Sequence, residues 1–277
     1  FFARGTQYWF KRPVIEARWD SSKKDNAGSF YLSSSLATAD ENLNKIYLYN
    51  NIRGQLRNIP VVGTGDIHVS IYSGSSAPTG SKLRLPTGGG VIRPEEFNIT
   101  GSYVSAGIYS ASFAYTSSAI TKIFPVWHTA SVQYHTGSGI TVKTFDSTDY
   151  NPSPRYVTTI TNLKDLYSQD EEARFKLHVR QKDWNPNIYT KASSNPENLI
   201  IEDGYYKVYR TIDDLDVVAY GTGSLNHTRL SFDVSGNYFD LPVELLEKDY
   251  MYGIKLLYKL PNGFYKEQPQ TFKFRVE

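Results

Sequence analysis

Short runs in which apolar and polar residues alternate recur along this chain. Such a period of two predicts strands that are buried on one face and exposed on the other. The clearest runs place these residues on the inward face: Phe175, Leu177 and Val179 in one, Ile67, Val69 and Ile71 in another, and Phe272, Phe274 and Val276 in the last. No long segment has the 3.6-residue period of a helix, so we predict an all-β chain.

The stretch "YWFKRPVIEARWD", residues 8–20, alternates in the same way. Ile15, Ala17 and Trp19 fall on one face, and Glu16 and Arg18 fall on the other. We therefore predict a strand here, although no other strand precedes it in the sequence. A serine-rich polar segment follows and is expected to be an extended connector.

The strand-like runs form two groups separated by a proline-containing linker, "DSTDYNPSPRY" at residues 146–156. Six or seven short strands between about residues 57 and 147 are enough for one β-sandwich. This predicts three regions: 1–56 as an N-terminal strand with its connector, 57–147 as a sandwich, and 148–277 as a second sandwich. Within the last, Pro261-Asn262-Gly263 predicts a hairpin turn.

Tyrosine is unusually frequent, with 22 residues, and 14 phenylalanines add to it, which suits pleated and half-buried surfaces. Tyr109 follows a glycine at the start of a strand, and Tyr250 and Tyr252 enter a late strand of the second group. Both places resemble the tyrosine corner of immunoglobulin-like and fibronectin-type sandwiches. The alternative is that these are ordinary core tyrosines. The predicted fold is thus two tandem antiparallel sandwiches of the immunoglobulin/fibronectin-III-like class.

Composition narrows the possible functions. The 277 residues carry 30 basic and 28 acidic side chains, and this balance gives no reason to expect nucleic acid or an acidic membrane as partner. Cysteine is absent, which excludes disulfides, thiolate zinc sites and cysteine nucleophiles, and is compatible with bacterial cytoplasm. No apolar run approaches the roughly 20 residues of a membrane span.

The chemistry-bearing residues form no recognisable catalytic pattern. His128 and His135 flank an expected hairpin and could approach each other, but no third metal ligand stands nearby. The cluster Asp213-Asp214-x-Asp216 is interpreted as a hairpin turn rather than a calcium loop. No G-x-S-x-G motif occurs. We therefore predict no catalytic, cofactor or metal residues, and no enzyme.

Aromatic residues in loop-like positions are the candidates for an interaction surface. Trp127, Trp184 and Tyr189 are the principal ones, and Tyr134 is a further candidate. Such a side chain plugs the end of its own sandwich, contacts a neighbouring subunit, or stacks on a sugar, and the sequence favours these in that order.

Whole segments of the chain resemble virion structural proteins of tailed bacteriophages, notably those of aquatic bacteria. They include "FKRPVIEARWDSSKKDNAGSFYLSSSL", "GIYSASFAYTSSAITKIFPVWH" and "FKLHVRQKDWNPNIYTKAS", so the resemblance runs from about residue 8 to the end. It implies a particle component with a larger β-rich region upstream, whose final strand would be residues 8–20. Alternatively, that strand adds to a sheet edge in a neighbouring subunit.

These observations lead to one expected function and one alternative. The first is a non-enzymatic structural component of a phage virion, in the capsid, neck, tail or a fibre, assembled in the host cytoplasm. Its expected partners are other virion proteins and further copies of itself in a symmetric particle, without direct contact to nucleic acid or membrane. The alternative is a carbohydrate-binding or adhesin module that contacts a glycan of the host surface.

Overall fold

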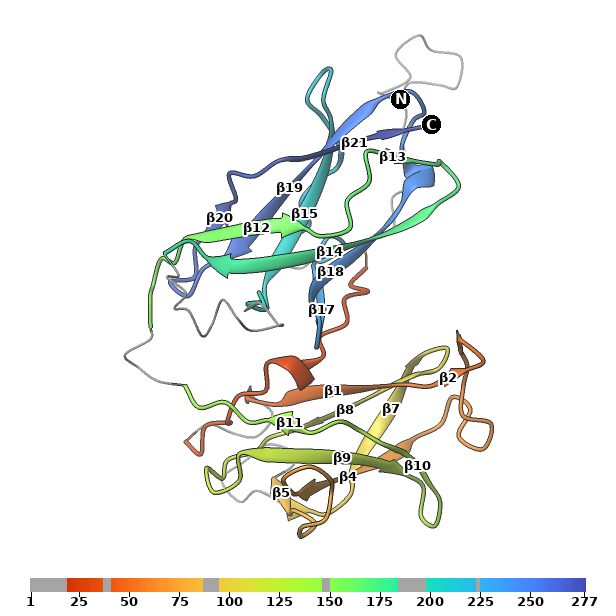
Figure 1. The fold of residues 1–277 in the computed structure, drawn as a ribbon, viewed down its shortest axis with the longest axis vertical. Helices are drawn as coiled ribbons and strands as arrows, with labels where there is room; N and C mark the ends of the chain where they lie inside the picture. Colours follow the sequence, from red (N-terminus) through yellow and green to blue (C-terminus); the bar gives the residue numbers. More distant parts are fainter. Residues whose placement is uncertain (1–18, 37–40, 87–94, 146–149, 184–197, 223–224) are drawn as a thin grey trace, which may run out of the picture.

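The structure is a computed structural model, and it describes residues 19–36, 41–86, 95–145, 150–183, 198–222 and 225–277. These residues form two β-sandwiches in tandem, one from the first half of the chain and one from the second (Figure 1). The predicted all-β class is confirmed. No helix in the described ranges is long and apolar enough to span a membrane.

The first sandwich is built on one path of paired strands in the order β1-β8-β7-β4-β9-β10, with β11 also paired to β9. Its main strands are β1 (Asn44–Tyr49), β4 (Ile67–Ser73), β7 (Ile99–Ser105), β8 (Ile108–Phe113), β9 (Lys122–His128) and β10 (Gln133–Thr136). The shorter ones are β2 (Asn51–Ile52), β3 (Gln55–Leu56), β5 (Leu85–Pro86), β6 (Glu95–Glu96) and β11 (Ile140–Thr141).

Strand β7 belongs to both layers of this first sandwich. Its first part, Ile99 to Gly101, pairs with β4, and its later part pairs with β8. At the crossover a Cβ atom on Gly101 would lie 3.0 Å from the Trp127 ring and 3.1 Å from the Ser110 carbonyl oxygen. Glycine therefore lets β7 turn from one layer to the other beneath the buried indole.

The second sandwich has two separate sheets. One has the order β12-β14-β18-β17, and the other has the order β13-β21-β19-β15-β16, with β20 paired to β19. Their bounds are β12 (Tyr156–Ile160), β13 (Leu166–Tyr167), β14 (Glu172–Gln181), β15 (Gly204–Arg210), β16 (Leu215–Val218), β17 (Ser231–Asp233), β18 (Gly236–Pro242), β19 (Met251–Lys259), β20 (Tyr265–Glu267) and β21 (Phe272–Val276). In immunoglobulin lettering, β12, β14, β18 and β17 correspond to strands A, B, E and D, and β21, β19 and β15 correspond to strands G, F and C.

The core of the second sandwich lies between its sheets and confirms the inward faces predicted from alternation. Phe175, Leu177 and Val179 are each at most 2% exposed. The Phe175 ring stacks on Phe239 at 5.0 Å, and Phe239 stacks on Tyr206 of the opposite sheet at 4.1 Å. Aromatic side chains thus join the layers, since each ring buries a large apolar area and stacking adds to it.

The boundary predicted at residue 57 is wrong, because strand β1 lies upstream of it and pairs along its full length with β8. Ile46 and Leu48 of β1, together with Phe30, belong to the core of the first sandwich. Alternation marked 44–49 as strand-like, but it did not show which sheet the strand joins. Strands up to β11 pair within the first sandwich, and strands from β12 onwards pair within the second.

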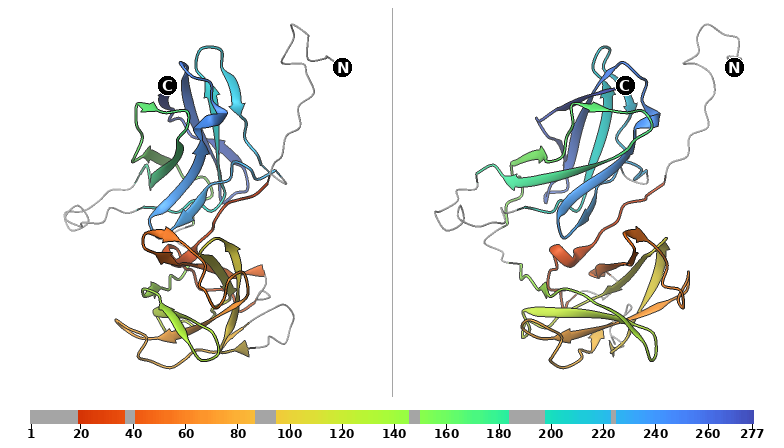
Figure 2. Two further views of the ribbon diagram at one scale, coloured as in Figure 1. Left: turned by 90° about the vertical axis from the view of Figure 1, so that its right-hand side faces the viewer. Right: turned by 45° about the vertical axis from the view of Figure 1, so that its right-hand side comes forward.

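The connector of residues 19–33 contacts both sandwiches (Figure 2). It runs along the second sandwich, makes a short helical turn at η2 (Asn26–Gly28), and then enters the first. Lys24 pairs in parallel with Phe232 of β17, and Tyr31 pairs in parallel with Lys143. The extended connector expected from sequence is therefore a shared element of the two units. Residues 8–18 of the predicted N-terminal strand lie outside the described residues.

Candidate functional site

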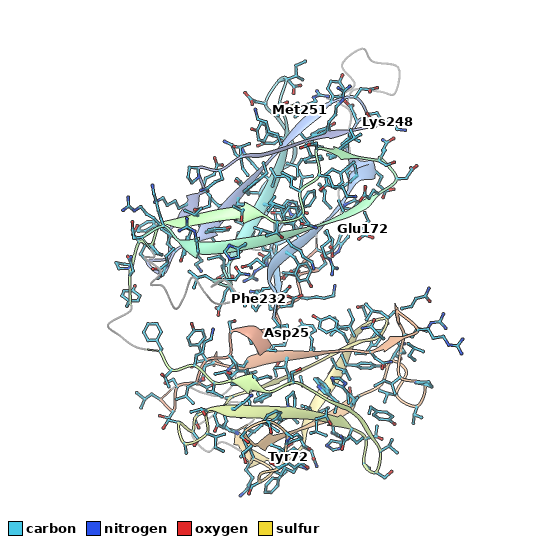
Figure 3. The ribbon with its side chains drawn as sticks, in the orientation of Figure 1. Asp25, Tyr72, Glu172, Phe232, Lys248 and Met251 are labelled. Atoms are coloured by element: carbon cyan, nitrogen blue, oxygen red, sulfur yellow. The ribbon has the colours of Figure 1, made fainter. Side chains whose placement is uncertain are left out.

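The connector is held to the second sandwich by main-chain hydrogen bonds at Phe232. The Asp25 N–H donates to the Phe232 carbonyl at 3.0 Å, and the Phe232 N–H donates to the Lys23 carbonyl at 2.9 Å. The Lys23 N–H donates in turn to Ser231 Oγ at 3.0 Å. Figure 3 shows Asp25 and Phe232 at the junction between the units. The connector therefore extends the β17 edge of the sheet, as an added strand does.

Asp25 is a buried carboxylate at this junction, with 4% of its surface exposed. Its Oδ1 accepts a hydrogen bond from the Ala27 N–H at 3.0 Å and thereby caps η2. Burial, which disfavours the charged form, together with the charge of nearby Asp233, raises the pKa of Asp25 to about 6, although the hydrogen bond from the Ala27 N–H acts to lower it. The junction therefore contains a group that titrates in mildly acidic solution.

Gly28 lies where the connector packs closely against the second sandwich. A Cβ atom on this residue would lie 2.8 Å from Val234 Cα, in the turn between β17 and β18. Backbone cannot move away as a flexible side chain can, so a larger residue at 28 would force the units apart.

A cluster of ion pairs surrounds Asp203, just before β15. Its carboxylate contacts the Arg229 guanidinium, Lys24 Nζ at 3.5 Å and Lys259 Nζ at 3.9 Å. Arg229 also lies 3.8 Å from Asp20 of the connector. Burial acts to raise the pKa of Asp203, but the hydrogen bond and charge of Arg229, with the two lysines, leave it below its ordinary value.

A cleft of about 820 Å³ opens beside the connector, between β16 of one sheet and β18 of the other. Trp19, Ser21 and Lys23 line one side, so an extended connector turns every second side chain towards it. The stacked rings of Tyr206 and Phe239 also line the cleft. Trp19 is 66% exposed, which leaves most of its indole uncovered at this site.

The charged side chains of the cleft are largely paired already. Both oxygens of Asp240 accept hydrogen bonds from Arg174, at 2.7 and 2.9 Å, and Asp216 lies 3.4 Å from Lys207. Burial, and then the charge of Asp240, raise the pKa of Tyr206 to about 12. Its hydroxyl is therefore protonated at neutral pH and available as a donor.

Of the aromatic residues that the sequence suggests for an interaction surface, the two that the structure describes pack against the core of the first sandwich. Trp127 is only 1% exposed and fills the core of the first sandwich, so its assignment to an interaction surface is wrong. Tyr134 is half-buried against the same core, with its hydroxyl 3.2 Å from Thr129 Oγ1. Trp184 and Tyr189 lie outside the described residues and stay predictions.

The histidine pair considered from sequence does not form. His128 lies across from His68, with ring centroids 6.0 Å apart, whereas His135 is level with Trp127. Both nitrogens of His128 are occupied, Nε2 at 2.7 Å from Ser70 Oγ and Nδ1 at 2.9 Å from the Thr129 carbonyl. Within the described residues, no three potential metal ligands gather at one place.

The acidic cluster forms the predicted turn. Residues 211–214 connect β15 to β16, and Asp214 has a positive φ of 53°, which aspartate tolerates in turns. The Asp213 carboxylate receives two hydrogen bonds from Arg210, at 2.6 and 3.0 Å. Its oxygens are thus engaged by a side chain of the same hairpin.

The tyrosine corner is present in the second sandwich. The Tyr252 hydroxyl donates to the Glu247 carbonyl and accepts from the Glu247 N–H, each at 2.9 Å, five residues upstream. This is the place between strands E and F where such corners occur. Tyr109 instead bonds a distant loop, by accepting from the Ile59 N–H and donating to the Gly63 carbonyl.

The sequence did not indicate Trp19 or Arg229 as members of a site. Trp19 was assigned to one face of a strand, but its neighbours in the cleft come from residues about 200 positions away. Alternation shows which side chains share a face, and it does not show which sheets meet.

No family model matches the chain, and no curated protein matches it. Among similar solved structures, the fibronectin(III)-like modules of Clostridium thermocellum CbhA are 8% identical over 92% of this chain and 90% of that chain, with a TM-score of 0.24. The N-terminal Ig1-2 module of the Drosophila receptor protein tyrosine phosphatase DLAR is 9% identical over 92% and 95%, with a TM-score of 0.25.

A Ca²⁺-stabilised adhesin that helps an Antarctic bacterium reach out and bind ice is also similar. It is 12% identical over 85% of this chain and 44% of that chain, with a TM-score of 0.22. These TM-scores are low, and the strand pairing of this chain itself defines its fold.

Proposed function

We propose that this chain is a non-enzymatic structural component of a tailed-phage virion that acts through protein–protein assembly. The resemblance of its segments to such proteins supports the proposal. The structural observation that carries it is the connector, which bonds Phe232 of the second sandwich and continues into the core of the first.

A paired connector suits a structural role because it couples the units. Domains that share only a flexible linker are expected to move relative to each other. Here main-chain hydrogen bonds, the close contact of Gly28 with Val234, and the ion pairs of Asp203 oppose such motion. Repeated copies in a symmetric particle require subunits of constant shape.

Strand β16 is the surface we assign to assembly. It forms the edge of its sheet, and Leu215 and Val217 are 48% and 37% exposed, while Ile212 in the adjoining turn is 77% exposed. An exposed apolar edge strand offers unpaired N–H and C=O groups to a strand of another chain. The expected partners are another copy of this chain or another virion protein.

Mass spectrometry of particles purified from the phage that encodes the chain tests the function. We expect a copy number that matches a symmetric element of the capsid or tail. Absence from the particles, or a trace amount unrelated to their symmetry, would show the proposal to be wrong.

A charged residue introduced on strand β16 tests whether this strand is the assembly surface. Leu215→Lys is expected to lower self-association or incorporation into particles about tenfold or more, because lysine on an edge strand opposes further pairing. Val61→Lys, at a residue that is 80% exposed in the first sandwich, is the matched control and should have no effect. Size-exclusion chromatography with light scattering measures both, and equal behaviour of the two variants would contradict this assignment.

One observation favours a second candidate function, a carbohydrate-binding or adhesin module. The exposed indole of Trp19 beside a cleft of paired charges is a surface on which a sugar can stack. Such a role is compatible with a place in a virion that contacts the host.

A further inference from the structure

We infer that the cleft between β16, β18 and the connector binds a neutral saccharide, with Trp19 as its stacking surface. This inference rests on the second candidate function and gives it a site and a ligand class. The cleft volume of about 820 Å³ lies within the range of small-molecule sites.

The connector that follows Trp19 is anchored before any ligand arrives. Asp20, the next residue, lies 3.8 Å from Arg229, and Lys23 and Lys24 are bonded to β17 and to Asp203. The indole nevertheless remains 66% exposed. One face of a pyranose ring presents C–H groups, which pack on an indole and cover its apolar surface. A fixed connector lowers the entropy lost when this contact forms.

The polar groups of the cleft favour a ligand without charge. Asp240 and Asp216 are neutralised by Arg174 and Lys207, and Arg229 is neutralised by Asp203. A free anion would meet the carboxylates that line the cleft, and a cation would meet Lys23 and Arg229. Hydroxyl groups both donate and accept, so they can bond the remaining lone pairs of the paired carboxylates without breaking an ion pair.

On its β17 and β18 side, the cleft suits a saccharide better than an added peptide strand, whereas the free edge of β16 is the one assigned to assembly. The connector already takes the β17 edge of that sheet, where Lys24 pairs with Phe232. Near the far end of β18, Pro242 has no N–H to offer a new strand. Side chains of β16, β18 and the connector also converge on the cleft, which is the arrangement of a small-ligand site.

Isothermal titration calorimetry with cellotriose, maltotriose, mannotriose and triacetylchitotriose tests the site. We expect at least one to bind the full chain with a Kd on the order of 0.1–1 mM. Trp19→Ala should weaken that binding about tenfold or more, and Trp19→Tyr should restore most of it, because tyrosine keeps an aromatic face. Phe264→Ala removes an aromatic side chain that is 72% exposed but outside the cleft, and should leave binding unchanged.

The possible outcomes distinguish an error in the location of the site from an error in the carbohydrate-binding function. Binding that Trp19→Ala does not weaken would overturn the cleft as the site while leaving a carbohydrate-binding function in place. No heat with any of the four sugars at 10 mM would overturn both. The assembly role, tested on particles, is unaffected by either result.

Discussion

The two sandwiches join their layers in different ways. In the first, β7 pairs with both layers, so the chain of strands is continuous from β1 to β10. In the described part of the second, the two sheets share no full strand, but residues 228–230, which lead into β17, pair briefly with β15: the Tyr206 N–H donates to the Thr228 carbonyl at 3.0 Å, and the Leu230 N–H donates to the Gly204 carbonyl at 2.8 Å. Rings such as Phe239, which stacks on Tyr206, add to this short bridge. The layers are therefore joined mainly by a shared strand in the first sandwich, and by a short backbone bridge with ring stacking in the second.

The tyrosines that were expected to mark corners show the same contrast. Tyr252 bonds the backbone of Glu247, five residues away, whereas Tyr109 bonds Ile59 and Gly63, 50 and 46 residues away. Tyr252 fixes a local bend between strands, whereas Tyr109 fixes a distant loop to the sheet. We therefore expect substitutions of the two tyrosines to destabilise different parts of the molecule.

The largest expected effect comes from removing the Trp127 side chain, which fills the core of the first sandwich beside Gly101. Trp127→Ala should lower the free energy of unfolding by about 3–5 kcal/mol, since it leaves a large cavity above Gly101. Hydrogen exchange measured by mass spectrometry should show faster exchange in β4, β7 and β9 and little change in β14 and β19. Equal loosening of both sandwiches would mean that they form one cooperative unit.

Asp25→Asn tests the junction that links the two regions. Burial raises the pKa of Asp25 from 3.8 to about 6, so the folded state holds this proton more tightly than the unfolded state. Its contribution to stability is therefore full below pH ~4 and is lost as the pH rises through about 6. At pH 7.5 the charged form costs up to about 3 kcal/mol.

Asparagine keeps the acceptor for the Ala27 N–H without the charge. We therefore expect the variant to be more stable than the parent by up to about 3 kcal/mol at pH 7.5 and equal to it below pH 4. Urea titrations across this range measure the difference. Asp66→Asn, at an exposed carboxylate, is the control. A gain that does not depend on pH would contradict the role of burial.

The smallest effects distinguish the two tyrosines. Tyr252→Phe and Tyr109→Phe each remove two hydrogen bonds and should cost about 1–3 kcal/mol. The loss at Tyr109 is expected to be the larger, because it leaves the N–H of the buried Ile59 without a partner. Amide exchange should rise at residues 243–249 in the first variant and at 59–65 in the second. The same pattern in both would remove the contrast between local and distant corners.

The strands and their inward faces could be predicted from the sequence, because a period of two needs only local information. Phe175, Leu177 and Val179 were placed correctly for this reason, and so was the turn at Asp213 and Asp214. The corner at Tyr252 was also indicated, since its partner is five residues away.

Tertiary structure alone decided how these strands meet. The burial of Trp127, the place of β1 in the first sandwich, and the pairing of Lys24 with Phe232 depend on residues tens to hundreds of positions apart. The cleft at Trp19 has the same origin. Alternation fixes the face on which a side chain lies, but the neighbour of that face is chosen by packing over the whole chain, and no local pattern contains it.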